Sequence, residues 1–252
     1  MLKELTRDDW LSLLNIPEDI IPKVLLLRGT RNLKANYEKH KLFFKDVIEV
    51  CTPNSIFEDV LIGTYKSKTV GYASVYGDAM ASEISHLFGI LGTSLVIQTG
   101  CCGALAGNIL AGDIVFATST HCGEGASQYY ISNKSEVEAS LELFDLIPNA
   151  NLSSVPIHKG SVWTTSALLA ESAEDLQRWN DQGYIAVDME TASTFAVAEY
   201  FGMKRMSLLF AFDSPRHGEH ILMTDVEKEN RRATGEQNMI DIILSIIEKY
   251  KQ

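Results

Sequence analysis

Two carboxylates, Asp188 and Glu190, stand where an apolar run ends and the alanine-rich run Phe195–Ala198 approaches. The pattern predicts a buried strand followed by a helix, and a carboxylate buried at that junction needs hydrogen-bond donors. A carboxylate only accepts hydrogen bonds, and the paired hydroxyls of a polyol such as ribose supply donors. The alternative is a helix start, where negative charge is favoured and Asp188 lies near the cap. Both interpretations stay open at this point.

A third acid, Asp213, closes the predicted buried strand Lys204–Asp213. Because Phe210 and Phe212 flank it, loss of hydration can raise the pKa of its carboxyl and make it a proton donor. The alternative is an ordinary N-cap or loop acid. In open α/β sheets ligands collect at the carboxyl ends of strands, so the polar turn that ends the predicted first strand, Lys23–Asn32, is another candidate wall of a site.

The composition limits the class of protein. The 252 residues suffice for one substantial core, and 46% hydrophobic with 22% charged residues is typical of globular domains. A net charge of −11 argues against a general binder of nucleic acid or anionic membranes. The charged N-terminal stretch and the absence of a long uncharged run predict a cytoplasmic protein without membrane spans. The four cysteines lack metal-ligand spacing, so we expect no metal and reduced thiols.

Strand and helix patterns alternate along the chain, which predicts a single α/β domain over 1–252 with a helical prefix over 1–20 that Thr6 caps. Within 94–104 a buried strand is expected to run into a glycine-bearing turn, and 123–130 is expected to be a loop. The expected strands span 23–32, 47–50, 94–104, 112–119, 156–166 and 204–213, with a two-stranded hairpin over 57–77. One helix is expected to follow the first strand and to end near 44. The other expected helices span about 79–91, 134–146, 173–182 and 225–249.

Several motifs resemble the nucleoside phosphorylase/nucleosidase superfamily in their order and spacing. The most specific are Val187–Ala192 and, about two dozen residues later, Phe212–Ser214. The resemblance covers roughly 22–250. Three further stretches agree with the family, and the last of them, with the 123–130 loop, leans toward its uridine-phosphorylase-like branch: Gln98–Ala104, Gly112–Val115 and Val162–Ser172.

The resemblance implies a mixed, twisted central sheet that is partly closed into a barrel and flanked by helices. Members of the family cleave the N-glycosidic bond of nucleosides with phosphate or water as acceptor. No cofactor is therefore expected, apart from phosphate where it serves as a co-substrate. The resemblance also implies a homo-oligomer, either a dimer or a hexamer built as a trimer of dimers, with a small nucleoside as the ligand.

Site residues follow from the resemblance position by position. Glu190 takes the place that holds the ribose hydroxyls, Met189 packs under the sugar, and Thr99 lies beside it. Asp213 takes the place of the acid that protonates the departing purine, so a purine-like base is favoured. An oxocarbenium-like transition state loads electrons onto the base, and a proton donor there lowers the barrier.

The positions that the resemblance assigns to the base suggest altered specificity. Ser166 replaces an acid that is common in the relatives, and Leu168 stands where an aromatic side chain often covers the base. The full set of base-side candidates is Gln128, Ser166, Leu168 and Asp188.

The phosphate side departs from the family pattern, in which arginines hold the anion. Gln98 stands at the position of a strand-end arginine, and Cys101 at that of a serine or threonine. The position of an arginine lent by a neighbouring subunit falls near Ser55, and Asp78 adds a negative charge. The cations near the first strand, at shifted positions, are Arg28, Arg31 and Lys34.

Three functions remain open on these residues. The main prediction is hydrolysis, with Asp78 or Glu124 activating water. The alternative is phosphorolysis at a rearranged phosphate site built from the shifted cations. The third is a non-catalytic nucleoside-binding protein, against which the joint presence of Glu190 and Asp213 argues, because pure binding has no need of an acid.

Overall fold

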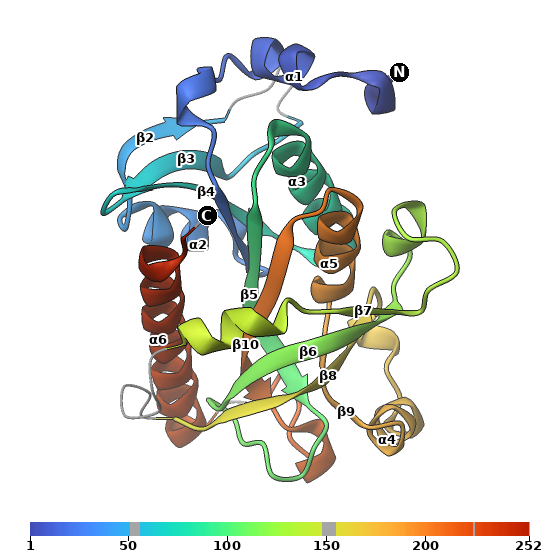
Figure 1. The fold of residues 1–252 in the computed structure, drawn as a ribbon. Coiled ribbons are helices and arrows are strands. Elements are labelled where there is room, and N and C mark those ends of the chain that lie inside the picture. The colour runs from blue at the N-terminus through green and yellow to red at the C-terminus, as the bar shows by residue number, and fades with distance from the viewer. Residues whose placement is uncertain (51–55, 148–154, 224, 252) are drawn as a thin grey trace.

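Strands and helices alternate along most of the chain in the computed structural model, which describes residues 1–50, 56–147, 155–223 and 225–251 (Figure 1). The strands are β1 (Val24–Gly29), β2 (Lys45–Glu49), β3 (Val60–Tyr65), β4 (Lys68–Val75), β5 (Leu95–Ala104), β6 (Ile114–Gly123), β7 (Glu136–Glu138), β8 (Ile157–Thr165), β9 (Tyr184–Asp188) and β10 (Lys204–Asp213). The α-helices are α1 (Arg7–Leu14), α2 (Leu33–Lys41), α3 (Gly77–Leu91), α4 (Ala173–Asp181), α5 (Thr191–Tyr200) and α6 (Val226–Lys249).

All the strands belong to one mixed sheet, in the order β10-β6-β8-β9-β5-β1-β4-β3-β2, with β7 paired to β6. The sheet closes on itself because β10 also pairs with β5, which makes a five-stranded barrel of β5, β10, β6, β8 and β9. Since β1, β5 and β10 run parallel, their carboxyl ends meet at the same edge. The predicted sheet, twisted, mixed and partly closed, is confirmed.

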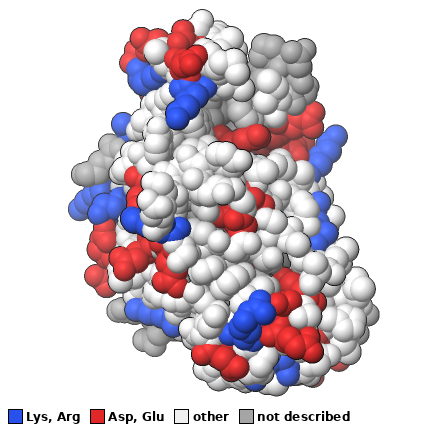
Figure 2. Space-filling model, turned by 90° about the vertical axis from the view of Figure 1, so that its right-hand side faces the viewer, with Lys and Arg blue, Asp and Glu red and all other residues white. Residues whose placement is uncertain are grey.

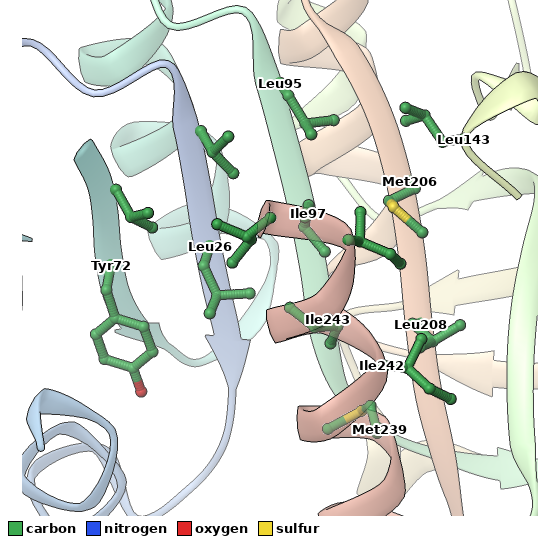
Figure 3. Packing of buried hydrophobic residues seen from close by; sticks show 14 of the residues in the cluster. Leu26, Tyr72, Leu95, Ile97, Leu143, Met206, Leu208, Met239, Ile242 and Ile243 are labelled. Carbon is green, nitrogen blue, oxygen red and sulfur yellow. The ribbon is translucent and has the colours of Figure 1, made fainter. Parts of the chain in front are cut away.

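Apolar side chains cover both faces of the central strands. All six residues of β1 are buried, as the uninterrupted apolar run predicts for a strand covered on both sides. On one face α6 packs its apolar stripe against the sheet, and Figure 3 shows Met239, Ile242 and Ile243 of α6 in one cluster with residues of the sheet. On the other face α3 contributes Leu87 and Phe88 to a second cluster. Burial on both faces fixes the strand ends that carry the site.

The termini of two helices follow their sequence signals. The Thr6 side chain accepts from the Asp9 N–H and caps α1, as predicted. The Asp225 carboxylate accepts from the N–H groups of Glu227 and Lys228 at the start of α6.

None of the helices within the described residues is both long and apolar enough to cross a membrane. On the face shown in Figure 2, basic side chains lie beside acidic ones.

The helix predicted over 134–146 is wrong. The segment forms the short strand β7 and then a 3-10 turn, Leu141–Leu146. Val137 is buried between two exposed glutamates, and this alternation with period two pairs the segment with β6. The acidic pattern resembled an outer helix face only because the apolar residues are too few to separate the two periods.

The glycine-bearing turn predicted toward the end of 94–104 is also wrong, because β5 continues as a strand to Ala104. A Cβ on Gly100 would lie 3.2 Å from the carbonyl oxygen of Gly29. The glycine therefore allows the backbones of β1 and β5 to approach closely, which is one reason for a glycine inside a strand. Similarly, β6 runs four residues past the predicted end at 119.

The approach of α6 to the barrel depends on a contact between two glycine backbones. A Cβ on Gly235 would lie 2.1 Å from the carbonyl oxygen of Gly112. We expect Gly235→Ala to lower the free energy of unfolding by about 1–3 kcal/mol, although alanine normally favours a helix over glycine by about 1 kcal/mol. Urea denaturation measures the change.

The matched control is Thr234→Ala, at an exposed position of the same helix, for which we expect a change within about 0.5 kcal/mol. If Gly235→Ala were as stable as the wild type, the close contact between α6 and the start of β6 would be contradicted.

Candidate active site

A cavity of about 580 Å³ opens at the edge where β1, β5, β9 and β10 end and α5 begins. Its wall combines residues that are far apart in the sequence. The candidates from the sequence that line it are Arg28, Arg31, Cys101, Leu168, Asp188, Met189, Glu190 and Asp213.

Glu190 is buried at the start of α5, with 5% of its surface exposed. Its Oε1 accepts from the Gly77 N–H at 2.8 Å, and a Cβ on Gly29 would lie 2.8 Å from its Oε2. Burial raises the pKa of Glu190 to about 8, and the nearby Asp188 carboxylate raises it too, against the lowering effect of the Gly77 N–H and Arg28. The carboxyl is therefore mostly protonated at neutral pH, when it can donate as well as accept.

Asp188 caps the helix. Its Oδ2 accepts from the Thr191 N–H at 2.8 Å and from the Thr191 hydroxyl, while its Oδ1 accepts from the Thr164 hydroxyl at 2.6 Å. The helix-start interpretation made from the sequence therefore applies to Asp188, whose carboxylate accepts from the first N–H group of the helix. Glu190 is free of this contact and lines the cavity. The base-binding role assigned to Asp188 stays a prediction, although its oxygens are already engaged inside the protein.

Asp213 ends β10 with 8% of its surface exposed. Burial raises the pKa of Asp213 to about 6, while Arg232 opposes the rise and Glu219 adds to it. The Arg232 guanidinium lies 3.9 Å from the centre of the Phe212 ring, and its Nε donates to the Phe212 carbonyl. An acid with a pKa near 6 can release and recover a proton near neutral pH.

Sequence analysis missed Arg232. It lies seven residues before Met239, on the face of α6 that is buried against the sheet, and is itself 8% exposed. A charged residue in register with an apolar stripe was the available signal.

Arg28 points from β1 toward α6 and is 5% exposed. It forms an ion pair with Glu236, which also pairs with Lys39 at 3.2 Å, and it lies 5.6 Å from the centre of the Phe210 ring. Its Nε and Nη1 are buried without a hydrogen-bond partner in the described part of the chain. A buried guanidinium with two unused donors is suited to an anionic or polar ligand.

Two other residues complete this side of the cavity. Burial raises the pKa of the Cys101 thiol to about 11, which keeps it protonated. Arg31 is exposed and its guanidinium lies 4.8 Å from the centre of the Tyr76 ring.

The remaining candidates lie outside the cavity wall. Gln98 is fully buried: its Oε1 accepts from the Thr194 hydroxyl, and its Nε2 donates to the Thr99 carbonyl. The Thr99 hydroxyl donates to the Leu27 carbonyl at 2.8 Å. Their predicted ligand-binding roles stay predictions, and both side chains are occupied by contacts that hold the strands.

Two of the base-side candidates, Gln128 and Ser166, do not line the cavity either. The Ser166 hydroxyl donates to Asp78 at 3.0 Å, and Gln128 is exposed. Glu124 accepts from the N–H groups of Ala126 and Ser127 in its own loop. The positions of Cys51 and Ser55 lie outside the described residues.

Comparison with known proteins agrees with these motifs. The Phosphorylase superfamily matches this chain over residues 44–248. A Purine nucleoside phosphorylase DeoD-type 2 from Vibrio parahaemolyticus is 26% identical over 204 residues, which cover 78% of this chain and 84% of the relative. A Purine nucleoside phosphorylase DeoD-type from Clostridium beijerinckii is 24% identical and covers 94% and 97%.

The fold has solved counterparts. A crystal structure of uridine phosphorylase from Vibrio fischeri superposes with a TM-score of 0.79, at 22% identity, over 93% of this chain and 95% of that one. At this identity the likeness concerns the fold, and it agrees with the barrel and helices described above.

The buried acid of Glu190 makes stability depend on pH. Its pKa is about 8 in the folded state and near 4.5 when exposed, so the folded protein holds a proton that the unfolded chain releases. Stability is therefore lost as pH rises from about 5 to 8. Glu190→Gln keeps an acceptor for the Gly77 N–H, and we expect it to gain more than about 1.4 kcal/mol over the wild type between pH 5 and pH 9.

Urea denaturation across this pH range measures the difference. Glu229→Gln, at an exposed position in the first turn of α6, should leave the pH dependence of the wild type unchanged. Parallel curves for Glu190→Gln and the wild type would contradict the raised pKa of Glu190.

Proposed function

Because the chain belongs to the phosphorylase superfamily, we propose that it cleaves the N-glycosidic bond of a purine-type nucleoside by phosphorolysis. The observation that carries the proposal is that one cavity is lined by Glu190, Asp213 and Arg28, and that the buried guanidinium of Arg28 has two unused donors. The relatives named above are phosphorylases, so the comparisons favour this alternative over the hydrolysis that the sequence placed first.

In the proposed reaction, Glu190 binds the ribose hydroxyls and Met189 packs under the sugar. The C1′–N9 bond breaks, and its electron pair moves onto the purine. Asp213, whose pKa of about 6 keeps part of the population protonated near neutral pH, gives its proton to N7 of the departing base. A phosphate oxygen then bonds to C1′ on the opposite face of the sugar, and the product is a pentose 1-phosphate.

Arg28 is the proposed ligand of phosphate. A guanidinium binds phosphate oxygens through its N–H donors, and Nε and Nη1 of Arg28, which lie on either side of the Nη2 engaged by Glu236, are each free to donate one hydrogen bond. Arg31 and Lys39, which also line the cavity, can add positive charge at its opening. This site is built at shifted positions, since Gln98 at the family's arginine position is engaged with Thr194.

Hydrolysis has less support from the geometry. The two acids that the sequence offered for activating water, Asp78 and Glu124, are not part of the cavity wall, and both carboxylates hold local contacts. Four further expectations stay proposals: one domain over 1–252, a homo-oligomer, a cytoplasmic location and no cofactor besides the phosphate co-substrate.

The acceptor is tested directly by incubating the purified protein with purine and pyrimidine nucleosides, each with and without phosphate. We expect free purine and pentose 1-phosphate in equal amounts, and only when phosphate is present. Release of base at the same rate without phosphate would replace phosphorolysis by hydrolysis. Binding of nucleosides with no release under either condition would indicate a non-catalytic protein.

Arg28→Gln tests the phosphate site. We expect at least a tenfold rise in the KM for phosphate with the KM for the nucleoside within about twofold, because the lost hydrogen bonds involve a charged group. Lys34→Gln is the matched control, since Lys34 is exposed and lies outside the cavity wall, and it should behave as the wild type.

Asp213→Asn tests the acid. The amide keeps the shape of the side chain but cannot give up a proton, so we expect kcat to fall by about 100-fold or more while KM changes little. A nucleoside of 7-methylguanine needs no protonation at N7, and its cleavage should fall by less than about tenfold. An equal loss for both substrates would contradict the role of Asp213 as proton donor. Asp181→Asn, at an exposed position, serves as the control.

A further inference from the structure

A second carboxyl group lines the same cavity as Asp213 and is not used in the proposed reaction. Glu171 follows the 3-10 turn Leu168–Ala170, in the connection between β8 and α4, and lines the cavity. Its Oε1 is buried and accepts no hydrogen bond from any residue that the structure describes. Leaving such an acceptor unsatisfied is unfavourable, so the group is suited to a partner that arrives with a ligand.

Glu171 and Asp213 are close enough for their charges to interact. Burial, together with the charges of Asp213 and Asp175, raises the pKa of Glu171 to about 7. Two neighbouring carboxyls lose their protons one after the other, so near neutral pH one can be protonated while the other is charged. Because the pKa of Glu171 is the higher of the two, a base that presents N7 to Asp213 and an N–H group to Glu171 must shift the proton onto Asp213, and Glu171 then accepts as a carboxylate.

The surroundings of this pair are apolar. A Cβ on Gly103 would lie 3.2 Å from the Val187 side chain, 3.3 Å from Asp213 Oδ1 and 3.7 Å from the ring of Pro215, so these three groups meet there. Leu168 lines the cavity next to Glu171 in the sequence. An apolar wall with two carboxyls fits a flat heterocycle that carries an acceptor and a donor on neighbouring edges.

We propose that Glu171 determines which base is accepted, by taking a hydrogen bond from an N–H group on the six-membered ring of the purine. This inference rests on the proposed function, because it presumes that the base lies against Asp213. With Asp213 at N7, a second carboxyl beside it reaches the edge of the six-membered ring. A carboxylate accepts from a 6-amino group or from the N1–H and 2-amino groups, whereas an unsubstituted purine offers it no donor.

Recognition of this kind discriminates strongly. A buried polar group that is built to bond a substrate N–H rejects an analogue that lacks it, because the protein group is then left unpaired. An apolar pocket of the same size would distinguish these bases only weakly. Glu171 therefore gives the site a polar selectivity that Leu168 cannot give.

The experiment measures equilibrium binding by calorimetry, without phosphate, for guanosine, adenosine and purine riboside, which carries no N–H on its base. We expect the wild type to bind at least one of the two amino-bearing nucleosides more tightly than purine riboside. Glu171→Leu should weaken that nucleoside by about 10- to 100-fold and purine riboside by less than twofold. Glu171→Gln, which keeps a neutral acceptor, should fall between the two.

Glu174→Gln is the matched control, because Glu174 is an exposed carboxylate on α4 three residues away and outside this cavity. The midpoint temperature of thermal unfolding of Glu171→Leu should be no lower than that of the wild type, since the substitution removes an unsatisfied group. An equal loss for all three nucleosides, or no loss for any, would overturn the role of Glu171.

The outcomes separate the two proposals. A wild-type protein that binds these nucleosides and cleaves none of them would overturn the proposed activity, and the binding comparison would still decide the role of Glu171. A wild-type protein that binds none of the three would overturn both.

Discussion

The burial of one carboxyl group, that of Glu190, constrains the architecture around the cavity. It is possible only where the backbone approaches without side chains and offers a donor. Gly29 leaves the space that a Cβ would take from Oε2, and Gly77, with a φ of +79° that other residues rarely adopt, donates its N–H to Oε1. The ends of β1, α3 and α5 must therefore converge at this point. Because Asp188 accepts from the N–H group at the start of α5, the Glu190 side chain is not needed to cap this helix.

The cavity is lined by more acidic than basic side chains, and if all of them were charged, this would oppose the binding of phosphate. Burial raises the pKa of Glu190, Glu171 and Asp213 to about 8, 7 and 6. Near neutral pH a large part of these groups is uncharged, so the field that an incoming anion meets is weaker than the number of carboxyls indicates. The same protons are available for the departing base. A site of this kind joins anion tolerance to acid catalysis through one physical cause, the loss of hydration.

The sequence predicted the framework of the site better than its details. The apolar runs located β1, β5 and β10, and the paired motifs brought Glu190 and Asp213 to one edge, because buried strands have strong and long signals. The sequence could not predict that Asp188 caps the helix while Glu190 lines the cavity, since this depends on which donors the fold brings near each oxygen. Glu171 was missed for a related reason: its burial follows from tertiary packing, and a lone glutamate before a helix looks like surface.

Helix α6 connects the two ends of the cavity. The charge of Arg232 lowers the pKa of Asp213, and Glu236 pairs with Arg28. Residues four apart in a helix lie on the same face, one turn from each other. Gly235, between them, brings this face against the backbone of Gly112. The depth at which α6 sits therefore sets the charge environment of the proposed proton donor and of the proposed phosphate ligand together. A shift of this one helix would change both ends of the site at once, which ties the leaving group and the acceptor to the packing of the barrel.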